Sequence, residues 1–334
     1  MVKRKVLFLP RTGLAQDILS PRARAVLEGL GEVTWNPMDR DYTADELAAL
    51  LPGADAVVTS WGSPNFTPEL LDVADQLKIV GHAAGSVKNR MPEEGYKRGI
   101  VVLSAAAVIA DSVAEYTLWA MLSMQRDLYS YDQLMKQEKG WKRADTGFAQ
   151  ELYYKKVGIV SASMVGRRVI KLLAPFKCDV LLFDPYVTAS ECMALGVKKV
   201  SLEVMFSTCD IVSLHAPVTP ETKELITRAH FDALHDGALF INTARAWVVD
   251  SPAMMDTLRT KRIRAVLDVF DKEPLEPDSE LRTMDNVFIT PHVSGHTTES
   301  RSRLVEEIAR DMERFFAGKQ LQYAVSWDRL RIMA

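Results

Sequence analysis

The stretch between Val157 and Tyr186 decides the fold that we expect for this chain. It begins VGIVSASMVGRRVI (157–170) and, after a helical run, ends DVLLFDPY (179–186). An apolar strand, a tight turn of small residues, a helix that opens in the turn and a second apolar strand ending on an acid make up a dinucleotide-binding βαβ unit. In such a unit the turn and the helix N-terminus receive a pyrophosphate, and the acid, here Asp184, accepts from ribose hydroxyls.

The turn departs from the usual pattern at two positions. Where that pattern has Gly-x-Gly-x-x-Gly, the chain has Ser161 and Ser163 and keeps the third glycine, Gly166. Serine is small enough for a short turn, but its Cβ is unfavourable wherever φ is positive. Two interpretations of the stretch therefore stay open here: a dinucleotide site, or an ordinary βαβ crossover.

Composition narrows the class of protein. A length of 334 residues favours two domains, and 48% hydrophobic with 25% charged residues is typical of a globular protein. The net charge of −3 argues against a nucleic-acid partner, and the three cysteines have no metal-like spacing. The apolar run 6–9 is too short for a signal peptide, and no stretch approaches the length of a membrane span. We expect a cytoplasmic protein with no metal site and no membrane or nucleic-acid partner.

Strand and helix signals alternate along both halves of the chain. Apolar strands are predicted at 5–9, 33–35, 55–61, 77–82 and 100–103, and again at 211–215, 238–242, 265–270 and 287–290. Helix starts are marked by Ser20-Pro21, by the capping box Thr43 to Glu46 and by Thr67-Pro68. A long apolar helix over 112–127 separates the halves, and an amphipathic helix over 298–316 ends at Gly318. This pattern predicts an α/β protein with parallel sheets covered on both faces.

Several phrases of the second half have a spacing that resembles a known family. They are VAE (113–115), LHAPVT (214–219), NTAR (242–245), LDVF (267–270) leading to Glu273-Pro274, and TPHVSG (290–295). Together with the βαβ unit they resemble the D-isomer-specific 2-hydroxyacid dehydrogenases over essentially the whole chain. The resemblance implies two doubly wound parallel-sheet domains with an interdomain cleft. A flavodoxin-like substrate domain would comprise residues 1–105 and 297–334, and a Rossmann-type NAD-binding domain residues 106–296; the family is commonly dimeric, so a homodimer is expected.

Three residues of these phrases suit the reduction of a 2-oxo acid. That reaction needs a hydride donor, a proton donor at the ketone oxygen and a cation for the carboxylate. His292 is a candidate acid, Glu273 would stabilise its imidazolium form, and Arg245 offers a planar fork that matches a carboxylate. Taken singly, the three read as a loop histidine, a turn acid and a surface charge; their order in the chain is what identifies them as the catalytic set.

The resemblance also implies binding residues. Its cofactor, NAD, would be bound by Ser161, Ser163, Met164, Val165, Gly166, Asp184, His215, Ala216, Pro217, Thr222, Thr243, Ala244, Asp268 and Gly295. The substrate acid would be bound by Gly85, Ser86, Arg245, His292, His82 and Trp61. A carboxylate at Asp184 would repel the 2′-phosphate of NADP, which favours NAD. His82 stands where many relatives have arginine and Lys88 where many have aspartate, so the identity of the acid stays open.

Two hypotheses of different classes follow. The first is an NAD-dependent D-2-hydroxyacid dehydrogenase that works mainly as a 2-oxoacid reductase on a small 2-oxo or 2-hydroxy acid. The second is an NAD(H)-sensing binding protein on the same fold, with weak or no turnover. The altered glycine turn favours the sensor, whereas the ordered set of Arg245, Glu273 and His292 favours the enzyme, because a sensor has no need of a proton donor.

Overall fold

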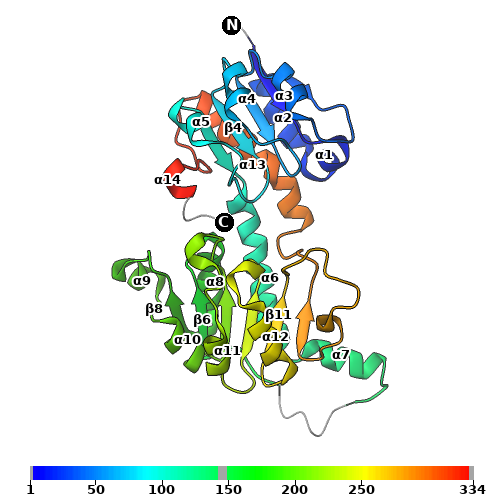
Figure 1. Cartoon of the computed structure of the whole chain (residues 1–334), viewed down its shortest axis with the longest axis vertical. Helices are drawn as coiled ribbons and strands as arrows, with labels where there is room; N and C mark the ends of the chain where they lie inside the picture. Colours follow the sequence, from blue (N-terminus) through cyan, green and yellow to red (C-terminus); the bar gives the residue numbers. More distant parts are fainter. Residues whose placement is uncertain (1–2, 142–148, 331–334) are drawn as a thin grey trace. The chain divides into compact units, whose positions relative to one another are not determined.

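The computed structural model describes residues 3–141 and 149–330, and the chain divides into two compact units. The first unit comprises Met1–Ile109 and His296–Ala334, and the second comprises Ala110–Gly295. Within the described residues each unit contains one sheet, and every strand pair is parallel. The expected α/β class with two parallel sheets is confirmed (Figure 1).

The sheet of the first unit has the strand order β2-β1-β3-β4-β5. This is the flavodoxin-like order, in which the strand sequence reverses beside the first strand. Its strands are β1 (Arg4–Phe8), β2 (Gly31–Trp35), β3 (Ala56–Thr59), β4 (Ile79–His82) and β5 (Val101–Ser104). Its helices are α1 (Thr12–Ile18), α2 (Pro21–Leu30), α3 (Ala44–Leu50), α4 (Pro68–Val73), α5 (Glu93–Lys97), α13 (Thr298–Phe316) and α14 (Trp327–Leu330).

The sheet of the second unit has the strand order β12-β11-β10-β9-β6-β7-β8. Numbered from β6, the order is that of a Rossmann sheet with one further strand at its edge. The strands are β6 (Lys156–Val160), β7 (Asp179–Phe183), β8 (Lys198–Lys199), β9 (Ile211–Leu214), β10 (Leu239–Asn242), β11 (Arg264–Leu267) and β12 (Val287–Ile289). The helices are α6 (Ala106–Gln125, which begins in the first unit), α7 (Leu128–Lys136), α8 (Met164–Leu173), α9 (Ala189–Leu195), α10 (Leu202–Thr208), α11 (Arg228–Ala233) and α12 (Ser251–Arg259).

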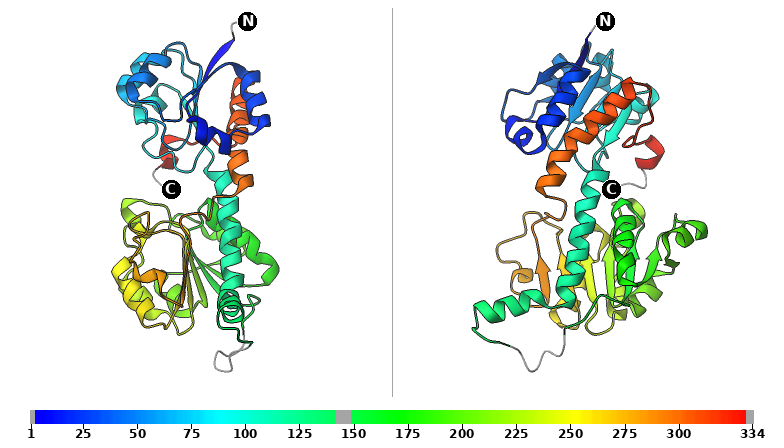
Figure 2. Two further views of the ribbon diagram at one scale, coloured as in Figure 1. Left: turned by 90° about the vertical axis from the view of Figure 1, so that its right-hand side faces the viewer. Right: turned by 180° about the vertical axis from the view of Figure 1, so that it is seen from behind.

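Each sheet has a hydrophobic core on both of its faces, which explains why its strands read as continuous apolar runs. In β1, Val6 and Phe8 pack with residues of α2 and α13, whereas Leu7 faces a second core with α3 and α4. In β6, Ile159 packs with α6 and α8, and Val160 packs with α10 to α12. Figure 2 shows helices on either side of each sheet. The carboxyl ends of the strands are thereby left to carry loops.

Helix starts agree with the capping signals of the sequence. Ser20 accepts from the Ala23 N–H at the start of α2, and Thr43 and Glu46 form the expected capping box of α3. Helices α1 and α7 are among those that were not predicted, because α1 is short and α7 lies in a stretch that reads as polar and charged. Among the described residues, no helix combines the length and the apolar character that crossing a bilayer requires.

Candidate active site

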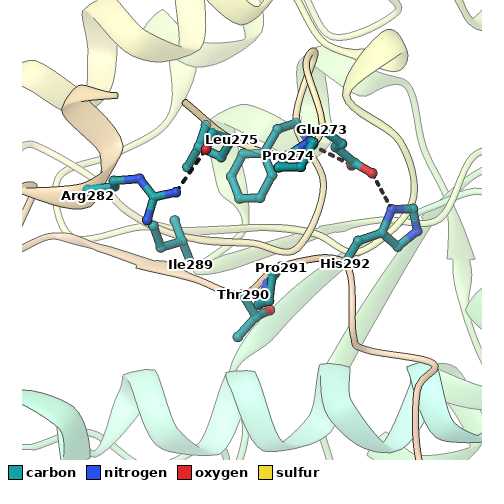
Figure 3. A pocket seen from close by; sticks show the side chains of 9 residues that line it. Glu273, Pro274, Leu275, Arg282, Ile289, Thr290, Pro291 and His292 are labelled. Carbon is teal, nitrogen blue, oxygen red and sulfur yellow. Dashed lines mark hydrogen bonds and ion pairs between the residues drawn. The ribbon is translucent and has the colours of Figure 1, made fainter. Parts of the chain in front are cut away.

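The loop after β12 brings His292 against Glu273. The imidazole Nδ1 lies 2.7 Å from Glu273 Oε2, and Glu273 Oε1 accepts from the Phe270 N–H at 3.1 Å (Figure 3). Burial acts to raise the pKa of Glu273, but the hydrogen bonds from His292 and the Phe270 N–H outweigh it and hold the pKa below its ordinary value. Because an ionised carboxylate only accepts, Nδ1 must donate, and Nε2 is then the ring atom that can exchange a proton with a substrate.

An apolar wall adjoins this pair. A cavity of about 560 Å³ is lined by Phe270, Pro274, Leu275, Ile289 and Pro291 together with Glu273, Thr290, His292 and Arg282. The Arg282 guanidinium donates to the main-chain carbonyl of Leu275 at 2.9 Å, as Figure 3 shows, and so closes one side of the cavity. The side chains of His292 and Glu273 are themselves 44% and 37% exposed, so water reaches the pair beside this apolar wall.

Arg245 follows β10 and is held through its main chain. Asn242 accepts from the Ala244 N–H at 3.0 Å and donates to the Arg245 carbonyl at 3.1 Å, while Arg245 Nη1 donates to the Ala244 carbonyl at 2.6 Å. Burial lowers the pKa of Arg245, and the charge of Glu273 opposes that shift. The guanidinium stays protonated at any physiological pH. The second unit therefore brings Arg245, Glu273 and His292 into one electrostatic neighbourhood.

The turn after β6 has the shape of a dinucleotide turn although it contains serines. Ser161 has φ +77°, the left-handed conformation that favours glycine, whereas Ser163 has φ −60° and an extended backbone. Ser163 Oγ accepts from the Gly166 N–H at 3.3 Å and caps α8. A Cβ at Gly166 would lie 2.1 Å from the Ser161 carbonyl oxygen, so this position admits only glycine. The first and third positions of the pattern thus keep their backbone roles.

Asp184 is hydrogen-bonded to this turn. Its Oδ2 accepts from the Ala162 N–H at 2.9 Å and from Ser161 Oγ at 3.3 Å, and its Oδ1 accepts from the Tyr186 N–H at 2.8 Å. The first turn of α8 contains no acidic residue, so its leading N–H groups and dipole suit an anion. A carboxylate beside a helix N-terminus is the donor and acceptor set that a ribose and a pyrophosphate need, and the residues present fit NAD.

The other predicted cofactor residues lie along the same edge of the sheet. His215 follows β9, the strand beside β6 at which the strand order reverses, and ligands of open α/β sheets bind at this point. Burial lowers the pKa of His215 to about 3, so its ring, which lies 2.9 Å from Ser213 Oγ, is uncharged. Thr222 uses its hydroxyl to donate to the Pro217 carbonyl at 2.6 Å, which shapes the loop that begins with Ala216.

Asp268 has protein partners for both carboxylate oxygens. It is fully buried, and it accepts from Thr290 Oγ1 at 2.6 Å, from the Val293 N–H at 2.8 Å and from the Ser294 N–H at 2.9 Å. Its expected contact with the nicotinamide amide stays a prediction, as do the contacts of Met164, Val165, Thr243, Ala244 and Gly295 with the cofactor. The described contacts show Asp268 holding the loop that carries His292.

The predicted substrate residues outside this set belong to the first unit. His82 is buried with Nδ1 2.9 Å from Thr59 Oγ1, and burial, with the charge of Arg90, lowers its pKa to about 3. The Gly85 carbonyl accepts from Ser104 Oγ at 2.8 Å, and Ser86 Oγ accepts from the Lys88 N–H at 3.3 Å. These contacts fix the strand-to-helix turn after β4.

Two arginines near these residues were not singled out from the sequence. Arg90 donates to the Ser63 carbonyl at 2.6 Å and to Asn65 Oδ1 at 2.9 Å. Arg301, in the first turn of α13, lies over the ring of Trp61 with its Cζ 4.6 Å from the ring centroid. Nothing in the spacing of the sequence pairs Arg301 with Trp61, because 240 residues separate them. The sequence offered one signal for this contact, which is the cation Arg301 near the start of a predicted amphipathic helix.

Comparisons with known proteins agree with this geometry. Residues 118–294 match the family described as D-isomer specific 2-hydroxyacid dehydrogenase, NAD binding domain. A Bacillus subtilis protein provisionally named a 2-hydroxyacid dehydrogenase is 32% identical over 97% of this chain and 96% of its own length. The D-3-phosphoglycerate dehydrogenase of Archaeoglobus fulgidus is 31% identical over 84% of this chain, but the match covers 53% of that protein. The chain thus spans little more than half the length of that relative.

Solved structures agree in fold. The TT0316 protein of Thermus thermophilus superposes with a TM-score of 0.76 at 27% identity, covering 96% of this chain and 99% of that one. A phosphoglycerate oxidoreductase of Rhizobium etli superposes with a TM-score of 0.82 at 24% identity, covering 97% and 98%. The Rossmann-type sheet and the turn after β6 agree with the NAD-binding domain of this family. The chain belongs to the D-isomer-specific 2-hydroxyacid dehydrogenase family, and its cofactor is NAD.

Proposed function

We propose that this protein reduces a small 2-oxo acid to the D-2-hydroxy acid with NADH. The observation that carries the proposal is the 2.7 Å contact between His292 Nδ1 and the ionised Glu273, with Arg245 in the same neighbourhood. A sensor of NAD(H) would need the turn and Asp184, but it would not need an imidazole held by a carboxylate. The family supports the reaction class, and the direction of the reaction and the class of acid are what we infer.

Each residue of the proposed site has a separate role in the reduction of the oxo acid. Bound NADH supplies the hydride that reduces the ketone carbon. Arg245 binds the substrate carboxylate through its fork, and His292 transfers the proton on Nε2 to the ketone oxygen. Glu273 keeps the proton on Nδ1 and stabilises the imidazolium that gives up the Nε2 proton. In the first unit, the backbone of Gly85 and Ser86, with His82 and Trp61, is proposed to contact the substrate acid as well.

The substrate residues of the first unit favour a compact acid with a polar or anionic end. Trp61 is 38% exposed and carries the Arg301 guanidinium on its face, which presents both an aromatic ring and a cation to a ligand. His82 is neutral in this setting and would act as a hydrogen-bonding group rather than a charge. Replacing Trp61 by leucine should therefore change the ranking of substrates more than the turnover of the best one.

A turnover assay over a panel of 2-oxo acids tests the proposed function. Glyoxylate, hydroxypyruvate, phosphohydroxypyruvate, pyruvate and a branched 2-oxo acid would each be mixed with NADH, and loss of NADH absorbance followed. NADH binding would be measured by fluorescence in the same samples. Turnover of at least one acid supports the reductase. Tight NADH binding with no turnover of any acid would instead favour the sensor.

We also propose a homodimer built on α6 and α7. Trp119, Leu128, Tyr129 and Met135 are large apolar residues that stay exposed on these helices, and the rings of Trp119 and Tyr129 both pack edge-on against Phe288. Large exposed apolar side chains gathered on neighbouring elements are typical of a protein interface. The mass in solution by light scattering should be twice that of the chain, and Leu128→Glu should shift it to the monomer. A monomeric wild type would contradict the dimer and leave the reductase untouched.

A further inference from the structure

Helix α6 presents two consecutive hydroxyls to the two loops that carry Arg245 and His292. Tyr116 Oη lies 2.7 Å from Thr290 Oγ1, two residues before His292. Thr117 Oγ1 lies 3.3 Å from Thr243 Oγ1, two residues before Arg245. All of these residues belong to the second unit. One turn of one helix therefore contacts two of the three loops that carry the proposed catalytic set.

The direction of the hydrogen bonds between Tyr116, Thr290 and Asp268 follows from the number of hydrogens that each group can donate. Thr290 Oγ1 donates its only hydrogen to Asp268 Oδ1 at 2.6 Å, so Tyr116 must donate to Thr290. Burial is the largest influence on Tyr116 and raises its pKa to about 12, so the phenol keeps its proton at neutral pH. The three groups form a chain of fixed polarity from Tyr116 through Thr290 to the carboxylate of Asp268.

That carboxylate holds the main chain on both sides of His292. It accepts from the Thr290 hydroxyl before His292 and from the Val293 and Ser294 N–H groups after it. His292 itself has φ +55°, and its N–H donates to the Thr290 carbonyl at 3.0 Å. A non-glycine residue adopts this left-handed conformation uncommonly. Here Asp268 accepts from groups on both sides of His292, and the imidazole lies against Glu273.

We propose that Tyr116 is a positioning residue for His292. Its hydroxyl fixes the orientation of the Thr290 hydroxyl, which in turn fixes Asp268 and the conformation of the loop 290–294. Tyr116 touches neither the imidazole nor Glu273 in any described contact, so it acts through the loop rather than on the reacting atoms. The inference rests on the proposed function of His292 as a proton donor.

Thr117 makes the weaker of the two contacts between α6 and the loops of the site. It donates its proton to the Val113 carbonyl at 2.8 Å, so Thr243 is the donor in the contact between the two threonines. At 3.3 Å that contact is longer than the usual separation of two hydroxyl oxygens. We therefore expect Thr117→Val to affect Arg245, and with it the KM for the oxo acid, less than Tyr116→Phe affects kcat.

Kinetics of matched variants test the proposal. Tyr116→Phe and Thr290→Val should each lower kcat about tenfold, the scale of a small misplacement of a catalytic group, with NADH affinity kept within about twofold. Thr290→Ser keeps the hydroxyl and should restore most of the turnover. Tyr154→Phe is the control, because that ring is 70% exposed. The double variant Tyr116→Phe/Thr290→Val should lose no more kcat than the worse of the two single variants, because both substitutions break the same chain of hydrogen bonds. Wild-type kcat in Tyr116→Phe, or fully additive losses, would overturn the proposal.

Amide hydrogen exchange gives a second readout that does not depend on turnover. Tyr116→Phe should speed exchange of the Val293 and Ser294 amides about fivefold, the scale of one weakened hydrogen bond, while the amides of β10 stay as in the wild type. Unchanged exchange at 293 and 294 would overturn the proposal, and so would an equal rise throughout the sheet, which would indicate general destabilisation. If the wild type turned over no acid, the proposed function would fail while the exchange experiment still tested the chain from Tyr116 to Asp268.

Discussion

At the scale of single residues, Asp184 has two roles, one toward the cofactor and one in the turn. It is expected to accept from the ribose hydroxyls, and it also accepts from the Ala162 N–H and the Ser161 hydroxyl of the turn. A neutral amide at this position would keep an oxygen acceptor for the turn but remove the charge that repels a 2′-phosphate. We therefore expect this residue to couple cofactor choice to the shape of the turn.

Asp184→Asn should relax the preference for NADH over NADPH and weaken NADH binding at the same time. The charge accounts for the first effect, and the loss of one charge-assisted hydrogen bond accounts for the second, which we expect to be about tenfold. The ratio of kcat/KM values with the two cofactors measures the first effect, and NADH fluorescence titration measures the second. Asp179→Asn is the control, because that acid pairs with Lys198 at the opposite end of β7. An unchanged ratio would mean that Asp184 does not face the ribose.

The sequence could name candidate site residues but not the contacts that hold them. His292, Glu273 and Arg245 were named from their order in the chain; the structure places His292 against Glu273, whose charge acts on Arg245, and their catalytic roles stay predictions. The chain from Tyr116 through Thr290 to Asp268 could not be predicted, because it joins residues that lie 174 and 22 positions apart. The positive φ of Ser161 was also open, since a serine in a glycine position can either bear the strain or change the turn.

At the scale of elements, α8 shows how the altered turn is tolerated. Ser163 takes an extended conformation that costs it nothing, and its hydroxyl caps the helix through the Gly166 N–H. Ser161 bears the left-handed strain, of the order of 1 kcal/mol, and its hydroxyl contacts Asp184. The two serines are therefore not equivalent, although the sequence pattern treats them alike.

Ser163→Ala should destabilise the protein by about 1 kcal/mol, because it removes the N-cap of α8. Ser161→Gly should be close to neutral, since relief of strain is offset by the lost hydroxyl contact and by the greater freedom of glycine in the unfolded chain. Urea unfolding of both variants and of the wild type measures the differences. A larger loss from Ser161→Gly than from Ser163→Ala would reverse the roles that we assign to the two serines.

Helices and strands lie where the sequence predicted them wherever a capping residue or a long apolar run marked them. The helices that begin at Pro21, Ala44 and Pro68 start at the predicted residues because Ser20, Thr43 and Thr67 each accept from an N–H three residues on. Helix α7 escaped prediction for a physical reason. Its apolar residues, such as Leu128 and Met135, remain exposed within the chain, so the period of a buried face is absent.

At the scale of the whole molecule, two buried histidines link stability to pH. Burial lowers the pKa of both His82 and His215 to about 3, whereas an exposed histidine has a pKa of about 6.5. Between these values the unfolded chain binds protons that the folded chain does not. The stability that the neutral rings contribute is therefore complete above pH ~6.5 and is lost progressively as the pH falls toward ~3.

The free energy of unfolding should fall by about 1.4 kcal/mol per pH unit for each of these histidines below pH ~6. Urea unfolding between pH ~6 and ~5 avoids most carboxylate titration, and burial also lowers the pKa of His230, which adds to the slope. His215→Asn should lower the slope by about 1.4 kcal/mol per pH unit relative to the wild type. Equal slopes in the wild type and His215→Asn would contradict the link between burial and pH.

We propose that His292 gives its Nε2 proton to the ketone oxygen as the carbonyl is reduced. The most direct measurement is kcat for the best 2-oxo acid in His292→Asn beside the surface control His235→Asn, with NADH affinity measured for both. Loss of the general acid should lower kcat by at least ~100-fold in His292→Asn and leave NADH affinity within about twofold, while His235→Asn behaves as the wild type. A kcat near the wild-type value in His292→Asn would contradict the assignment of His292 as the proton donor.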